Sequence, residues 1–152
     1  MQKIKILLVD DEEEFVRSLS DRIRLRDQQS EIALNGEQAL KSVGEDLPDV
    51  MVLDLKMPGM DGLEVLRRVK KAYPNIQVIM LTGHGSDKDE KEARRLGAFE
   101  YLQKPVEIET LMQHIRRAFK SKAESSMAAA TFAEAGDFDT AKEIMDKEKD
   151  KR

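Results

Sequence analysis

The chain has 152 residues, a formal net charge of −4 and no cysteine. This length fits one compact domain with a modest appendage. The absence of cysteine excludes a disulfide framework, a thiolate metal site and a cysteine nucleophile. The mixed, slightly acidic charge argues against a nucleic-acid partner, and no apolar run approaches the roughly 20 residues that span a bilayer. The start of the chain lacks a secretory-signal pattern, so we expect a soluble cytoplasmic protein with no membrane partner.

The first half of the chain alternates short aliphatic runs with amphipathic stretches. Aliphatic runs bounded by acids or turn residues predict strands at 4–9, 31–34 and 50–53. Apolar residues at helical spacing predict helices at 13–26, 37–43 and 63–73, the last of them between a turn at 58–62 and Pro74.

The same alternation continues in the second half. Strands are predicted at 76–81 and 99–102, and helices at 87–96 and 108–119, with Gly97 as the stop of the first helix. Five strands that alternate with five helices predict a parallel sheet covered by helices on both faces, in a three-layer α/β domain.

Polar side chains stand at the ends of four of these strands. Asp10 and Asp11 follow the first strand, Asp54 the third, Thr82 the fourth and Lys104 the fifth. In an open α/β sheet, ligands bind outside the carboxyl ends of the strands, at the point where strand order reverses. We therefore expect three carboxylates, a hydroxyl and an ammonium group to face one crevice.

These residue types suit the binding of a phosphoryl group. Carboxylates packed together repel one another unless a cation compensates, and oxygen ligands favour a hard cation such as Mg²⁺. Mg²⁺ is usually shared with phosphate oxygens, which Lys104 and Thr82 could also contact. Asp54 is the candidate nucleophile, because carboxylates form aspartyl-phosphates.

Four short motifs extend this interpretation to a family. They are Val9-Asp10-Asp11-Glu12, the run from Asp54 to Gly62, Leu81-Thr82-Gly83-His84, and Lys104-Pro105. Together, in this order and spacing, they make residues 3–120 resemble the receiver domain of bacterial two-component response regulators, of the chemotaxis-response-regulator kind. The resemblance implies a flavodoxin-like, doubly wound sheet with strand order 2-1-3-4-5. It also implies a receiver domain at 1–120 and a separate helical tail at 121–152.

The resemblance assigns roles around the metal. It implies that Asp54 is the phospho-acceptor and that Asp11 binds Mg²⁺ directly, with Asp10 acting mainly through water. The backbone carbonyl of Lys56 would complete the protein ligands. The Lys56 side chain and His84 would modulate the lifetime of the phosphoryl group.

The remaining implied roles concern the response to phosphorylation. Thr82 and Tyr101 resemble the paired switch residues, and Lys104 the phosphate-binding lysine. A cis peptide bond is implied before Pro105. The switch would change the surface formed by the fourth helix, the fifth strand and the fifth helix.

A histidine kinase is the expected phosphodonor, and a downstream protein would bind this surface; a homodimer is a further expectation. We expect no enzyme activity beyond the chain's own phosphorylation and dephosphorylation. One alternative is a small Mg²⁺-dependent aspartyl-phosphate phosphatase, which would need a second acid where Lys56 stands. An FMN carrier would need a Ser/Thr/Gly loop after the first strand, where acids stand instead. We expect no DNA-binding domain after the receiver unit, and therefore expect output through protein contacts, a phosphorelay or the tail.

The tail is the least determined segment. Its pattern predicts a helix over 127–135, a break at Gly136-Asp137 and a second helix over 140–151. This hairpin resembles part of a tetratricopeptide repeat, but a single unit cannot bury its own apolar face. The tail would therefore be either a partly flexible extension of the last helix or a segment that docks on the receiver, on a second copy or on the partner.

Overall fold

The structure is a computed structural model that describes residues 3–134, with side chains described for residues 3–122. Strands and helices alternate along these residues. The strands are β1 (Lys5–Val9), β2 (Gln29–Ala33), β3 (Val50–Leu53), β4 (Gln77–Thr82) and β5 (Glu100–Gln103). The helices are α1 (Glu13–Arg24), α2 (Gly36–Glu45), α3 (Gly62–Ala72), α4 (Asp87–Arg95) and α5 (Ile108–Glu134).

The five strands form one parallel sheet in the order β2-β1-β3-β4-β5. This confirms the predicted flavodoxin-like fold and its strand order. The central strand β3 is buried at every residue. A strand of this kind is aliphatic throughout because helices cover both faces of a parallel sheet.

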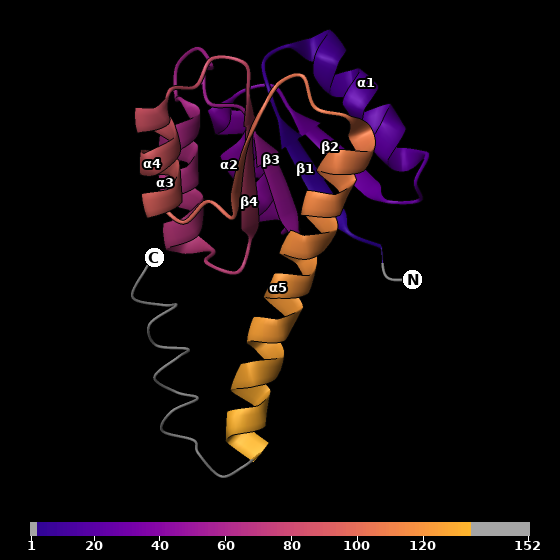
Figure 1. Cartoon of the computed structure of the whole chain (residues 1–152), viewed down its shortest axis with the longest axis vertical. Coiled ribbons are helices and arrows are strands. Elements are labelled where there is room, and N and C mark those ends of the chain that lie inside the picture. The colour runs from indigo at the N-terminus through magenta and orange to yellow at the C-terminus, as the bar shows by residue number, and fades with distance from the viewer. Residues whose placement is uncertain (1–2, 135–152) are drawn as a thin grey trace.

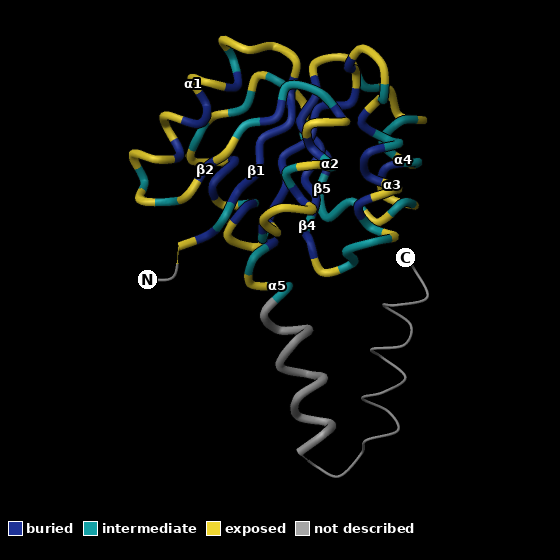
Figure 2. Tube along the Cα trace, turned by 180° about the vertical axis from the view of Figure 1, so that it is seen from behind, coloured by how far each residue is buried: buried dark blue, intermediate teal, exposed yellow. Residues whose placement is uncertain are grey.

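Each face of the sheet carries its own hydrophobic core. Helices α1 and α5 pack on one face, and α2, α3 and α4 on the other (Figure 1). The core under α1 and α5 includes Ile6, Leu8, Ile23 and Ile115, and the opposite core includes Met51, Leu53, Leu66 and Met80. The strands are accordingly the most buried part of the chain, and the exposed residues gather on the helices and loops (Figure 2). In the described part of the chain, no helix is long and apolar enough to cross a membrane.

The last helix is longer than the sequence pattern predicted. The expected end at Phe119 is wrong, because α5 continues to Glu134 and runs past the end of the sheet (Figure 1). Residues 120–134 contain five alanines and neither glycine nor proline, so nothing in them favours ending a helix. Lys122, in the extended part of α5, also contacts the residue before β3, because its Nζ donates a hydrogen bond to Asp49 Oδ1 at 2.8 Å. The predicted turn at 136–137 and the second tail helix lie outside the described residues.

Candidate functional site

Asp10 and Asp54 lie side by side at the point where the strand order reverses. Asp10 directly follows β1 and Asp54 directly follows β3, and these strands are neighbours in the sheet. The Asp54 amide donates to the carbonyl of Val9 at 2.9 Å, so pairing continues to the end of both strands. Each aspartate is only 4% exposed. Strand pairing, rather than loop flexibility, therefore fixes where both carboxylates stand.

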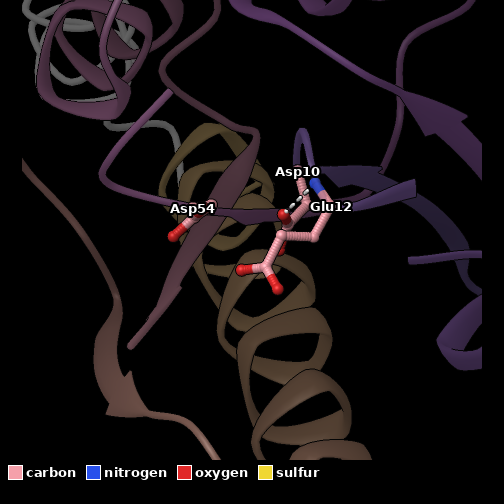
Figure 3. A group of neighbouring side chains, drawn as sticks. All are labelled: Asp10, Glu12 and Asp54. Atoms are coloured by element: carbon pink, nitrogen blue, oxygen red, sulfur yellow. Dashed lines mark hydrogen bonds between the residues drawn. The ribbon is translucent and has the colours of Figure 1, made fainter. Parts of the chain in front are cut away.

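A third carboxylate, that of Glu12, joins this pair. Oxygen atoms of Asp10, Glu12 and Asp54 all lie within 4.8 Å of one another (Figure 3). The Glu12 amide also donates to Asp10 Oδ1 at 2.9 Å, which holds the start of α1 against the aspartate. The sequence interpretation gave Glu12 no role in the site. We call Asp10, Glu12 and Asp54 the carboxylate group.

Asp11 lies outside the carboxylate group. Its side chain is exposed. It lines a neighbouring hollow of about 380 Å³, together with Asn35, Glu37 and Met60. The structure thus brings Asp10 and Asp54 together as the strand ends predicted, and places Asp11 at the rim beside them.

Lys104 reaches the carboxylate group from the end of β5. Its Nζ lies 2.7 Å from Asp10 Oδ2 and 3.2 Å from Glu12 Oε1. The same ammonium stands 4.3 Å from the centroid of the Phe15 ring, a favourable cation–π distance. The peptide bond between Lys104 and Pro105 is cis, as expected. A cation from one edge of the sheet is therefore paired with a buried carboxylate at its centre.

The electrostatics leave excess negative charge at this site. Burial raises the pKa of Asp54, and the Asp10 charge raises it further, while Lys104, Thr82 and the Leu55 amide lower it without cancelling the rise. Burial likewise raises the pKa of Asp10 despite its bond to Lys104. For Lys104, burial lowers the pKa, but the bond and charge of Asp10 outweigh it, so its pKa is raised. One ammonium for three carboxylates is the balance expected where a divalent cation also binds.

The predicted switch residues, Thr82 and Tyr101, are both buried. Thr82 is fully buried, and its Oγ1 accepts a hydrogen bond from the His84 amide at 3.2 Å. Tyr101 is 7% exposed, and its hydroxyl has no hydrogen-bond partner among the described residues. Burial raises the pKa of Tyr101, as do the nearby acids at the start of α4. The side chains of His84 and Lys56 are both exposed.

The fold and this arrangement of carboxylates, lysine and threonine define a receiver-type phosphorylation domain. Residues 6–116 match the family described as the response regulator receiver domain. The chain therefore belongs to this family. Receiver domains act in phosphorylation-dependent two-component signalling with histidine kinases and downstream partners, are not conventional enzymes, and generally bind Mg²⁺ at an acidic pocket.

Individual relatives agree with this membership. Sporulation initiation phosphotransferase F of Bacillus subtilis is 37% identical over 117 residues, which cover 77% of this chain and 94% of that protein. The uncharacterized transcriptional regulatory protein YkoG of the same organism is 36% identical, over 87% of this chain but only 58% of that protein. A crystal structure of a CheY-like receiver domain protein from Methanospirillum hungatei is 26% identical with a TM-score of 0.78, covering 81% of this chain and 98% of that one.

Proposed function

We propose that Asp54 accepts the phosphoryl group and that the chain works as a phosphorylation-driven switch. The observation that carries the proposal is the carboxylate group, with Lys104 bonded to it, at the sheet's point of strand reversal. Asp54 is the member of the group that Lys104 leaves unbonded, since the ammonium contacts Asp10 and Glu12. An Asp54 oxygen is therefore available to a reacting phosphorus atom.

The residues present fit a bound Mg²⁺. All the donors are oxygens, and the pKa values of Asp10 and Asp54 are raised by burial first and by a neighbouring carboxylate second, with Lys104 offsetting the rise only in part. Asp10, Asp11, Asp54 and the backbone carbonyl of Lys56 are the proposed ligands, with Glu12 as a further candidate. When bound, the ion supplies positive charge for the oxygens of the transferred group.

The transfer itself needs little covalent machinery. An Asp54 carboxylate oxygen attacks the phosphorus of a phosphohistidine, the P–N bond breaks, and the departing imidazole nitrogen takes a proton from solvent. Lys104 moves from its carboxylate partners to the phosphoryl oxygens, and the Thr82 hydroxyl donates to one of them. In dephosphorylation water attacks the same phosphorus and the Asp54 carboxylate leaves. The exposed side chains of Lys56 and His84 control how readily that water approaches.

Phosphorylation changes the surface formed by α4, β5 and the first half of α5, where a partner would bind. We call this surface the output face. Thr82 and Tyr101 connect the site to it, because β4 and β5 are paired and Tyr101 lies on β5. An ion pair crosses the face, from Arg94 of α4 to Glu100 of β5 at 2.8 Å. The proposed partners are a cytoplasmic histidine kinase as phosphodonor and a downstream protein or a second copy on the output face.

All the proposed site residues precede Lys120, so residues 1–120 form the proposed receiver unit. The tail, 121–152, would contribute to contacts rather than chemistry. Its apolar residues would dock on the output face, on a second copy or on the partner.

Incubation with a small acyl phosphate and Mg²⁺ tests the proposal. One acid-labile, hydroxylamine-sensitive phosphoryl group per chain is expected, and a chelator should abolish its formation. Asp54→Asn should prevent labelling, whereas Asp21→Asn, at an exposed position of α1, should leave it unchanged. Equal labelling of the two variants would overturn the assignment.

A further inference from the structure

Gly85 lies in the loop between β4 and α4, directly against the ring of Tyr101. A Cβ atom built on Gly85 would overlap the Tyr101 hydroxyl oxygen and lie 2.8 Å from the ring carbon Cζ. It would also lie 3.0 Å from Cγ2 of Thr82. Tyr101 and Thr82 therefore meet at the place where any other residue at 85 would carry its side chain.

The need for glycine here comes from space and not from the backbone. Among the described glycines only Gly59 and Gly97 have a positive φ, so an alanine could adopt the backbone conformation of Gly85. The neighbouring Gly83 gives a matched comparison. Apart from its two chain neighbours, a Cβ on Gly83 would come no closer than 3.9 Å to another residue, and the atom at that distance belongs to the flexible Lys104 side chain.

The inward position of Tyr101 is held by packing alone. The ring belongs to the core under α2, α3 and α4, but its hydroxyl is buried without a hydrogen-bond partner. A buried hydroxyl with no partner is unfavourable, and this penalty narrows the free-energy gap between the inward position and one with the hydroxyl in water. A small change in the space beside the ring is then enough to shift the balance between the two positions.

We propose that Gly85 is a positioning residue of the switch: by lacking a Cβ it admits the Tyr101 ring to the buried place beside Thr82. The inference rests on the proposed function for the meaning of that movement, because Thr82 is the proposed sensor of the phosphoryl group. The residue at 85 sets the fraction of unphosphorylated molecules that have the ring inside. When the ring leaves, it moves toward solvent at the edge between α4 and β5, which is part of the output face.

The test observes the ring directly. The full chain is labelled with 3-fluorotyrosine in a Tyr73→Phe background, which leaves Tyr101 as its single tyrosine. Fluorine NMR is recorded without phosphodonor or metal, and a soluble paramagnetic chelate reports exposure of the ring. Overpacking disfavours a state by roughly tenfold to a hundredfold, so Gly85→Ala should reduce the inward population by that factor. The resonance should shift, and the chelate should broaden it.

Gly83→Ala is the control and should leave both the shift and the broadening as they are in the parent. An unchanged resonance in Gly85→Ala would overturn the inference, and so would an equal change in Gly83→Ala. Because no phosphorylation is involved, the result is independent of whether Asp54 is the acceptor.

A second measurement separates crowding from general damage to the loop. In a Tyr101→Leu background, Gly85→Ala should lower the urea midpoint of unfolding much less than it does in the parent, because the end of the ring is gone and only the 3.0 Å approach to Cγ2 of Thr82 remains. If Gly85→Ala instead lowered the midpoint equally with tyrosine and with leucine at 101, the loop itself would require glycine and the inference would fail.

Discussion

Replacing Lys104 by methionine would remove the ammonium that contacts the buried Asp10 carboxylate. The lysine side chain is 13% exposed and that of Asp10 only 6%, so the pair is well shielded from water. Removing one partner of a buried ion pair costs roughly 3–5 kcal/mol, because the other charge is left uncompensated. Methionine keeps a long unbranched chain against Phe15, so the loss is mainly electrostatic. We expect about 3 kcal/mol at neutral pH, the lower end of the range, since Asp10 can take up a proton.

The pH dependence has a definite sign. Lys104 lowers the pKa of both Asp10 and Asp54, so its removal raises both further in the folded state. A carboxyl with a raised folded-state pKa contributes stability that is present below its unfolded pKa and is lost as pH rises through its folded pKa. The deficit of the variant should therefore be largest near neutral pH and should shrink toward about pH 4, the unfolded pKa of aspartate.

Urea unfolding followed by circular dichroism measures this deficit, since the chain has no tryptophan. Lys91→Met, at an exposed position of α4, is the control and should change the free energy of unfolding by no more than about 0.5 kcal/mol. The reasoning is refuted if Lys104→Met costs less than about 1 kcal/mol at pH 7, on the scale of an exposed pair. A deficit that grows as the pH falls would refute it equally.

Three further changes have expected outcomes. Asp54→Asn should raise the free energy of unfolding at neutral pH by about 1–2 kcal/mol, because it removes a buried carboxylate. It should also weaken the stabilisation by Mg²⁺, which in the parent reaches about 2.7 kcal/mol when the ion is at 100 times its dissociation constant. Thermal unfolding with and without the ion measures both effects. Tyr101→Phe should not lower the free energy of unfolding in urea and should raise it if anything, since it removes a buried hydroxyl that has no partner. A chain ending at Lys120 should fold and become phosphorylated, with a free energy of unfolding lower by about 0.2–1 kcal/mol because the Lys122–Asp49 ion pair is lost. It should differ from the full chain in self-association, measured by sedimentation, or in partner binding.

A specific result would contradict each of these three predictions. Unchanged Mg²⁺ stabilisation in Asp54→Asn would remove this carboxylate from the metal site. A loss above about 1 kcal/mol in Tyr101→Phe would mean that the hydroxyl is hydrogen-bonded after all. An unfolded chain ending at Lys120 would make the tail part of the core, and a shortened chain that matched the full chain in all contacts would end the docking proposal.

The sequence was most informative where the backbone alone decides position. Asp10 and Asp54 were expected to meet because each follows a buried aliphatic strand, and parallel strands bring their carboxyl ends to one edge. The same reasoning predicted the position of Lys104, which comes directly after the fifth strand. These expectations needed no knowledge of side-chain rotamers, so periodicity and order along the chain were enough.

Side-chain direction and close packing were beyond the same reasoning. Glu12 looks like an ordinary acid at a helix start, favoured there by the helix dipole, and only the geometry turns it toward Asp10 and Lys104. Gly85 looks like a loop glycine, and nothing in its neighbours along the chain indicates that the Tyr101 ring lies against it. The end of α5 is a different case, since the alanine-rich run free of glycine and proline was visible and favoured continuation.

Chemical trapping of the phosphorylated residue tests the central claim most directly. Borohydride reduces an aspartyl-phosphate to homoserine, and peptide mapping after treatment with an acyl phosphate and Mg²⁺ then locates the reduced residue. Homoserine should appear at position 54 alone, and it should be absent when the phosphodonor is omitted. Reduction at Asp10, at Glu12 or at any other carboxylate, with position 54 unchanged, would contradict the assignment of Asp54 as the phospho-acceptor.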